Sequence, residues 1–257
     1  MTVKDGKLHF SQLKQFAQSP AHYIVARDAE FSDSTEKRIG RAVHRRWLQN
    51  KPILVYEGIR RGKEWEAFYI KALEDHGIMK DDILSPSENE IVVGCVDSLN
   101  RHALAGELLA GCKDVEEHIT WERDGVECSG TPDAWNDDTL IELKTCSCAK
   151  PRKFLYDAHK FGYHAQLAWY DIGLGTKFQQ FATNWRKHYI IAVETKPPYS
   201  VVVYKVDDAR IDQGHMLCEE WMSKYIECRE TGFYPSYTTE EPVIWDAEII
   251  IENEEEE

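Results

Sequence analysis

A short polar turn near the middle of the chain joins two segments with the composition of strands, and this hairpin constrains the fold more than any other feature. The segments run from Val126 to Trp135 and from Thr139 to Thr145. A hairpin of this size brings Asp133 close to Glu142 and Lys144. The sequence therefore predicts two carboxylates and one ammonium group close together on neighbouring strands.

The spacing within the second strand predicts which side chains share a face. Because side chains alternate along a strand, Glu142 and Lys144 lie on one face and Leu143 points the other way, into the core. Two carboxylates on one face repel each other unless a cation binds there, and Mg²⁺ is usually held by one or two carboxylates. The pattern predicts a divalent metal site, although a solvated face with an ion pair would have the same residues.

The rest of the chain has both helical and extended patterns. Residues 10–112 predict mostly helices, and a capping box at Ser85-Pro86-Ser87-Glu88 starts one that runs toward Leu109. Residues 115–145 predict three strands in one meander, with Asp124-Gly125 as the first turn. The remaining predicted elements are a helix over 153–173, strands over 178–193 and 200–206, and a final helix over 208–232.

The hairpin also carries a known combination of residues. Gly130-Thr131-Pro132-Asp133, followed by Glu142-Leu143-Lys144, resembles the signature of the PD-(D/E)xK nuclease superfamily. Further motifs are similar to those of one branch, the RecE-like (exonuclease VIII-type) exonucleases of phages and prophages. They are the pattern Gly40-x-x-x-His44, an acid at Glu116 that opens the strand through Ile119 and Trp121, and the pattern Tyr163-x-x-Gln166.

The resemblance extends from about Phe10 to about Gly232 and implies a fold. It implies a mixed α/β (α+β) protein with the αβββαβ core of restriction-endonuclease-like nucleases and an N-terminal helical lobe. Residues 1–114 are expected to form the helical part that carries the histidine, and residues 115–235 the nuclease core, as one integrated domain. Residues 236–257 are expected to form an acidic, flexible tail.

The resemblance also implies a role for each motif. The expected catalytic residues are Asp133, Glu142, Lys144 and Gln166. The expected metal ligands are His44, Asp133, Glu142, the backbone carbonyl of Leu143, and Glu116. Only one of the neighbours Glu116 and Glu117 can face the site, and we prefer Glu116 because the run Glu116-x-x-Ile119-x-Trp121 fits the family spacing better. One or two Mg²⁺ ions are expected, and Mn²⁺ suits the same oxygen ligands. The structural alternatives are a core histidine at position 44 and a helix-surface glutamine at position 166.

The net charge of the chain is unusual for a protein that is expected to bind DNA. The chain has 45 acidic and 31 basic residues, for a net charge of −14, whereas DNA binding depends on basic side chains at phosphates. Part of the acidic excess lies in the tail, which ends in Glu254 to Glu257. The basic residues are clustered, which predicts a basic channel, although ordinary solvated helix ends have the same composition. The expected DNA contacts are Arg41, Arg45, Arg60, Arg61, Lys150, Arg152, Lys153 and Tyr163.

Cysteine usage and hydropathy restrict the cofactors and the location. The seven cysteines have neither a disulfide framework nor the usual spacing of a zinc site. None precedes Cys95, so the iron–sulfur cluster of some RecB-like nucleases is not expected either. No apolar run has the length of a membrane span, and the first residues lack the apolar region of a signal peptide. The sequence predicts reduced thiols, no membrane partner and a cytoplasmic location in a bacterial host cell.

The resemblance finally implies an activity. A RecE-like protein is expected to be a Mg²⁺-dependent exonuclease that digests one strand of duplex DNA from the 5′ end and leaves 3′ overhangs. Its expected partners are DNA ends, further copies of itself in a ring (a trimer or tetramer), and a single-strand annealing protein. The alternatives are an endonuclease, a single-strand or 3′→5′ nuclease of the same superfamily, and a non-catalytic protein that binds partners through its acidic surface.

Overall fold

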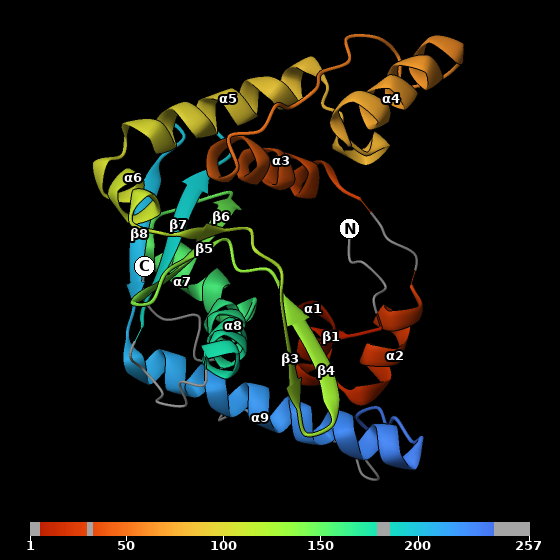
Figure 1. Cartoon of the computed structure of the whole chain (residues 1–257), viewed down its shortest axis with the longest axis vertical. Helices are drawn as coiled ribbons and strands as arrows, with labels where there is room; N and C mark the ends of the chain where they lie inside the picture. The colour runs from red at the N-terminus through yellow and green to blue at the C-terminus, as the bar shows by residue number, and fades with distance from the viewer. Residues whose placement is uncertain (1–5, 30–32, 179–185, 239–257) are drawn as a thin grey trace, which may run out of the picture.

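The computed structural model describes residues 6–29, 33–178 and 186–238, which form two β-sheets surrounded by helices (Figure 1). The larger sheet has five strands in the order β2-β5-β6-β7-β8, and the smaller has three in the order β1-β4-β3. The strands are β1 (Leu8–His9), β2 (Asp114–Val115), β3 (Ile119–Arg123), β4 (Val126–Gly130), β5 (Ala134–Trp135), β6 (Thr139–Cys146), β7 (Lys187–Glu194) and β8 (Val201–Val206). The helical segments are α1 (Phe10–Leu13), η1 (Lys14–Ala17), α2 (Pro20–Asp28), α3 (Thr35–Val43), η2 (His44–Leu48), α4 (Lys63–His76), η3 (Lys80–Asp82), α5 (Pro86–Arg101), α6 (Ala103–Ala110), α7 (Pro151–Lys160), α8 (Tyr163–Phe178) and α9 (Asp208–Thr231).

Strand β6 lies in the middle of the larger sheet and separates two hydrophobic cores. It runs parallel to β7 and antiparallel to β5. Ile141 and Leu143 pack with α3, α5 and α6, whereas Leu140 packs with α7, α8 and α9 on the opposite face. Glu142 therefore shares its face with Leu140, and Leu143 is fully buried on the other side, as predicted. The mixed α/β architecture is confirmed.

The predicted meander of three strands is wrong in one respect. The turn at Asp124-Gly125 is present, with positive φ angles of 50° and 69°, and it joins β3 to β4. The expected strand from Val126 to Trp135 breaks after Gly130, however, and its two halves belong to different sheets: β4 pairs with β1 and β3, whereas β5 pairs with β2 and β6. Pro132 lacks the N–H group that a continuous ladder requires. The break places Asp133 between the two sheets.

Two of the predicted helices are each divided. The capping box at Ser85 is present, but α5 ends at Arg101, because His102 is extended and caps α6 by accepting a hydrogen bond from Ala105. The helix expected over 153–173 is instead the pair α7 and α8, which Gly162 separates with a φ of +68°. The strand expected from residue 178 begins at Lys187, and residues 179–185 lie outside the described residues.

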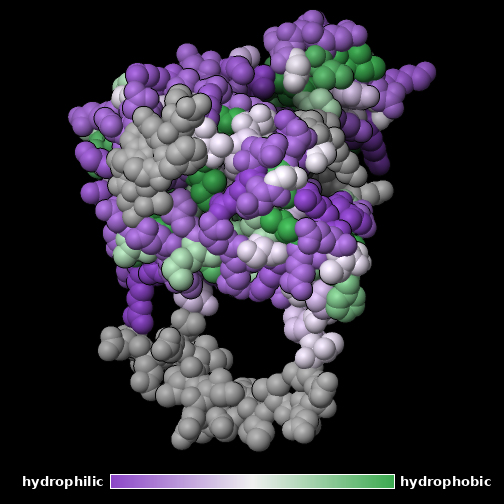
Figure 2. Space-filling view, turned by 60° about the horizontal axis from the view of Figure 1, so that its bottom comes forward, coloured by the Kyte–Doolittle hydropathy of each residue, from purple (hydrophilic) through white to green (hydrophobic). Residues whose placement is uncertain are grey.

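The N-terminal part and the core share structural elements. Strand β1 pairs with β4 in parallel, so the first described residues complete the smaller sheet. Helix α4 projects from the rest and has a small core of its own, formed with Trp65, Ala72, Ile78 and Ile83. Figure 2 shows a mostly hydrophilic face, with hydrophobic surface gathered over α4, where Ile70 and Leu73 are partly exposed.

The end of the described chain lies beside α2. The carbonyl of Pro235 accepts a hydrogen bond from the N–H of Ala21, and the ring of Tyr237 stacks on His22. Most of the predicted acidic tail, residues 239–257, lies outside the described residues. The cysteines are free thiols. Within the described ranges, no helix has the length and apolar character needed to cross a membrane.

The close contact between α8 and α9 gives a testable prediction for stability. A Cβ atom at Gly214 of α9 would lie 2.5 Å from the carbonyl oxygen of His164 in α8, and a backbone group cannot move aside without shifting the helix. We expect Gly214→Ala to lower the free energy of unfolding by about 1–3 kcal/mol, measured by urea denaturation. The matched control is Gly106→Ala in α6, where a Cβ meets nothing within 4 Å; it should be neutral or stabilising by up to about 1 kcal/mol. Equal effects of both substitutions would contradict the packing argument.

Candidate active site

His44 lies where α3 changes from an α-helix into a π-helical turn. The N–H of Gln49 bonds to the carbonyl of His44, five residues earlier, and such turns are frequent at functional sites. Gly40 lies one helical turn before His44. A Cβ atom at this position would lie 3.2 Å from the Thr145 hydroxyl oxygen, so the glycine lets α3 lie close to β6. The Nδ1 atom of His44 donates to the Gly40 carbonyl at 2.8 Å. Its Nε2 atom is thereby directed toward Asp133, at 3.2 Å from Oδ2.

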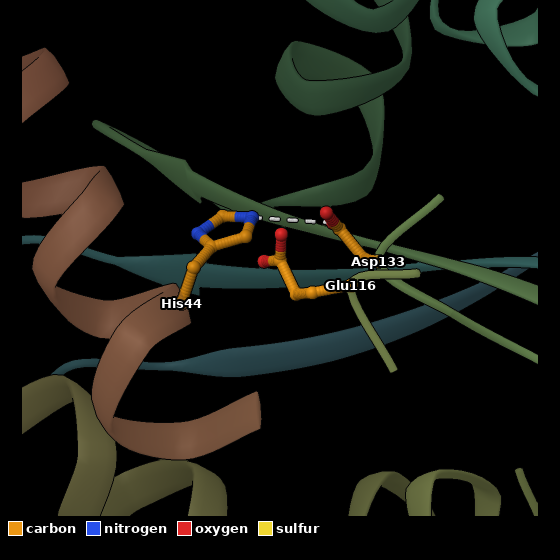
Figure 3. A group of neighbouring side chains, drawn as sticks. All are labelled: His44, Glu116 and Asp133. Atoms are coloured by element: carbon orange, nitrogen blue, oxygen red, sulfur yellow. Dashed lines mark hydrogen bonds and ion pairs between the residues drawn. The ribbon is translucent and has the colours of Figure 1, made fainter. Parts of the chain in front are cut away.

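Glu116 and Asp133 complete a group of three side chains that point toward one another (Figure 3). Their ligand atoms and one from His44 all lie within 4.8 Å of each other. Glu116 has a positive φ of 53° in the loop between β2 and β3, and its N–H donates to the Asp133 carbonyl at 2.9 Å. Glu116 thus lies before the strand that the sequence analysis expected it to open. Glu117 binds Lys177 at 2.7 Å instead.

The pKa values in this group indicate a negative potential that favours binding of a cation. Burial and the neighbouring Asp133 raise the pKa of Glu116 to about 7. Burial works against a charged His44, but the Asp133 carboxylate outweighs it and raises the pKa of His44 to about 9. Burial also works against ionisation of Asp133, yet His44 and Lys144 hold its pKa below the usual value. Two carboxylate oxygens and one imidazole nitrogen at this spacing fit a divalent cation.

Glu142 and Lys144 form a second, adjoining part of the site. The Lys144 ammonium donates to Glu142 Oε2 at 2.7 Å and to Gln166 Oε1 at 2.9 Å, and Gln166 donates to the Tyr170 hydroxyl at 3.1 Å. Burial and the charge on Asp133 raise the pKa of Glu142 to about 7. Burial works against the charge on Lys144, but Glu142 and Asp133 raise its pKa above the usual value, so Lys144 is an ammonium ion here.

Asp133 connects the two parts. Its Oδ2 atom accepts a hydrogen bond from the N–H of Leu143 at 2.6 Å, and its own N–H donates to Glu142 Oε1 at 3.4 Å. These bonds tie the residue after Pro132 to strand β6, so the carboxylate is fixed from both sides. The structure therefore brings together His44, Glu116, Asp133, Glu142, Lys144 and Gln166.

A cavity of about 520 Å³ opens beside the group of His44, Glu116 and Asp133. Arg41 and Arg45 of the predicted DNA contacts line it, together with Lys37, which lies two turns before His44 and which helical spacing could have indicated. Acidic Asp82 lines it as well. The cavity is wide enough for part of a ligand strand beside the metal-ligand candidates.

The predicted basic channel is only partly formed, because several of its members bind acidic side chains or backbone carbonyls of this chain. Arg41 pairs with Asp33 and Asp82, and Arg60 pairs with Glu88. Lys153 pairs with Asp157 on its own helix, and Arg45 donates to the carbonyls of Pro52 and His76. Three further basic candidates, Arg61, Lys150 and Arg152, are exposed to solvent.

Two aromatic residues, Tyr163 and Tyr170, lie close to Lys144 and its partner Gln166. The Lys144 ammonium lies 4.9 Å from the centre of the Tyr163 ring, at a distance that favours a cation–π contact. Tyr170 was not selected from the sequence, although its spacing of four residues from Gln166 places both on one helix face. Its hydroxyl fixes the Gln166 amide.

The chain is similar to a protein family and to solved structures. The profile of the PDDEXK-like domain of unknown function (DUF3799) matches residues 9–242. The crystal structure of a "Putative exonuclease" from Eubacterium rectale has a TM-score of 0.64 and 12% sequence identity, and the match covers 93% of this chain and 91% of that chain. The structure of SSO0001 has a TM-score of 0.30 at 13% identity, over 83% of this chain and 82% of that one, which is too low to support an argument. No curated protein matches the chain.

These similarities agree with the fold and with the arrangement of the site. At 12% identity, the Eubacterium rectale structure supports the nuclease-like fold alone. The family profile covers nearly all of the described chain, including β5, β6 and the segments that carry His44 and Gln166. The predicted PD-(D/E)xK superfamily is thereby confirmed, and the chain belongs to the PDDEXK-like DUF3799 family.

Proposed function

We propose that the protein is a Mg²⁺-dependent nuclease that hydrolyses phosphodiester bonds in DNA. The observation that carries the proposal is that the candidate metal ligands His44, Glu116 and Asp133 are linked to the charged Lys144 through Glu142. Asp133 belongs to the group with His44 and Glu116, and its N–H bonds to Glu142, which holds the Lys144 ammonium at 2.7 Å. Hydrolysis of a phosphodiester needs charge neutralisation at the phosphate and an oriented water in one place, and these side chains could supply both.

The residues have distinct proposed roles. His44, Glu116 and Asp133 would hold the cation, with Glu142 and the carbonyl of Leu143 as further candidate ligands beside them. A divalent cation bound there would supply positive charge against the phosphate and favour ionisation of water. Lys144 is a donor that can orient the attacking water or stabilise charge on a phosphate oxygen. Gln166 and Tyr163 hold the ammonium in place.

The proposed substrate is the end of duplex DNA, and the proposed reaction proceeds 5′→3′ along one strand and leaves 3′ overhangs. The resemblance of the motifs to RecE-like exonucleases supports this choice. The Eubacterium rectale neighbour is described as a "Putative exonuclease", which agrees with action at an end and not with a particular polarity. By the same resemblance we propose a ring-shaped homo-oligomer, a single-strand annealing protein as partner, and a cytoplasmic location in a bacterial cell.

One experiment tests the function. Linear duplex DNA labelled at the 5′ or the 3′ end, closed circular duplex and single-stranded DNA are incubated with the protein and Mg²⁺ or Mn²⁺. We expect release of 5′-terminal nucleotides from the linear duplex alone, and no release by the Asp133→Ala variant prepared in parallel. Cutting of closed circles would instead identify an endonuclease. The absence of any hydrolysis with either metal would refute the enzymatic function and leave a binding protein with a nuclease fold.

Metal binding gives a further prediction that does not depend on activity. We expect Mg²⁺ or Mn²⁺, at about a hundred times its dissociation constant, to raise the melting temperature by about 5–10 °C relative to the protein in chelator. The Asp133→Ala variant should lose this shift, because it removes the carboxylate shared by both parts of the site. Asp97→Ala is the matched control, since Asp97 is exposed on α5 and should leave the shift unchanged. An equal shift in both variants would mean that the metal binds elsewhere.

A further inference from the structure

A second cavity, of about 340 Å³, approaches the candidate active site from the side of Tyr163 and Gln166. Among the residues that the structure describes, none that lines this second cavity also lines the larger cavity beside His44. Gln166 accepts a hydrogen bond from Lys144 at 2.9 Å. The second cavity therefore begins at the side chains that hold the catalytic lysine candidate, and the larger one begins at the metal-ligand candidates. A strand lying across the site would reach both.

The second cavity differs from the rest of the chain in charge. None of the described residues that line it is Asp or Glu, although the chain has 45 acidic residues and 31 basic ones. Besides Gln166 and the two tyrosines, the side chains on its wall that can donate hydrogen bonds to an anion are Lys14, His9, His118, Ser11, Ser129 and Thr131. Because acidic residues outnumber basic ones in the chain as a whole, an acid-free wall beside Lys144 points to an anionic ligand.

Lys14 is the strongest positive group in this cavity. It begins η1, and no ion pair joins its ammonium to a carboxylate of the described residues. Burial, and after it the charge of Lys144, lowers the pKa of Lys14. Two ammonium groups near each other are unfavourable unless an anion lies close to both. A phosphate is an anion that Lys binds well as a point charge.

The mouth of the cavity also has an aromatic surface. Phe161 lies between α7 and α8, is 49% exposed, and has its ring centre 6.0 Å from that of Tyr163. A bound phosphate ion alone would not contact this exposed ring. The base of a nucleotide could stack on it, because any of the bases can stack on an aromatic side chain.

We propose that this cavity binds one nucleotide unit of the DNA next to the scissile phosphate, with its phosphate on Lys14 and its base against Phe161. The proposal rests on the proposed function, because it takes DNA as the substrate. The volume is near the lower end of the range for small-ligand sites, which suits a single nucleotide unit. Lys14 and Phe161 are then binding residues that determine how the strand is held.

The test measures binding of deoxyadenosine monophosphate and of deoxyadenosine to the full chain by NMR titration, without divalent metal. We expect Lys14→Gln to weaken binding of the monophosphate about tenfold and to leave binding of the nucleoside unchanged. We expect Phe161→Ala to weaken both about tenfold, since stacking on one base contributes roughly this much. The controls are Lys205→Gln on β8 and Leu155→Ala, which is 53% exposed on α7; neither should change binding.

DNA hydrolysis separates failure of this inference from failure of the proposed function. In the hydrolysis assay, Lys14→Gln should raise KM about tenfold and change kcat less. If the wild-type protein hydrolyses DNA while Lys14→Gln and Phe161→Ala keep wild-type binding and KM, the nucleotide site is refuted and the nuclease function stands. If the wild-type protein binds the monophosphate through Lys14 but hydrolyses nothing, the site is supported and the nuclease function is refuted. Unchanged melting temperatures show that both variants are folded.

Discussion

Replacement of Lys144 by alanine is expected to lower the rate of DNA hydrolysis by about a thousandfold. The ammonium lies between Glu142 and Gln166, where it can orient a water or stabilise charge on a phosphate, and loss of one such donor costs about a hundredfold to a thousandfold. Removal of the ammonium also removes the charge that keeps the pKa of Glu142 from rising further. The rate is measured with linear duplex DNA under single-turnover conditions.

Two comparisons make this result specific. Lys205→Ala removes an exposed lysine from β8 and should leave the rate unchanged. The Lys144→Ala protein should still show the metal-dependent rise in melting temperature, because His44, Glu116 and Asp133 remain. A residual rate above about a tenth of the wild-type value would exclude Lys144 from the chemistry, since groups in this role contribute at least about a hundredfold.

Replacement of Asp171 by alanine is expected to lower the free energy of unfolding by about 3–5 kcal/mol. Asp171 of α8 accepts a hydrogen bond from Arg186 at 2.7 Å, and both side chains are buried, with exposed fractions of 5% and 0%. The Nε2 atoms of His188 and His215 each lie 3.7 Å from a carboxylate oxygen of Asp171. Its loss leaves the guanidinium buried without its carboxylate. Urea denaturation at pH 7 measures the change.

Low pH should reduce the difference in the free energy of unfolding between the wild-type protein and Asp171→Ala. Burial works against ionisation of Asp171, but His188, His215 and Arg186 hold its pKa well below the usual value. A depressed pKa stabilises the folded state above the unfolded-state pKa of about 4, and this contribution is lost as the pH falls toward the folded-state pKa. The wild-type protein should therefore lose stability more steeply below about pH 4 than Asp171→Ala does.

An exposed ion pair is the control for this prediction. Glu220 and Lys224 on α9 lie 2.5 Å apart, with side chains 54% and 45% exposed. Solvent screens such a pair, so Glu220→Ala should change the stability by no more than about 0.5 kcal/mol. A loss below about 1 kcal/mol for Asp171→Ala would mean that water reaches Arg186 once the carboxylate is gone, and would contradict its assignment as a buried ion pair.

The parts of the fold that could be predicted from sequence depend on local periodicity and on turn residues. The alternation along Thr139 to Cys146 correctly separates Glu142 from Leu143, because the period of a strand is two whatever its partners are. The cap at Ser85 and the turn at Asp124-Gly125 are also local features. Each of these depends on a few neighbouring residues, which the sequence contains in full.

The features that sequence did not predict depend on distant partners. Gly130 and Ala134 are four residues apart but pair in different sheets, and one partner of β4 is Leu8, near the other end of the chain, which pairs with Cys128. In the same way, the neutralisation of Arg41 and Arg60 depends on acids that other helices contribute. A charge cluster in sequence therefore does not indicate a free positive surface. The roles of the site residues stay predictions until the substitutions are measured.

The π-helical turn after His44 has a consequence for comparing this chain with its relatives. Such a turn closes its hydrogen bond over five residues, so it accommodates one residue more than the α-helical turn it replaces. A relative with a regular helix here would align only across a single-residue gap after the histidine. The spacing from Gly40 to His44 lies before the gap and would be preserved, whereas the spacing from His44 to Trp47 would not. Gaps at this position in an alignment should thus trace which relatives share the turn.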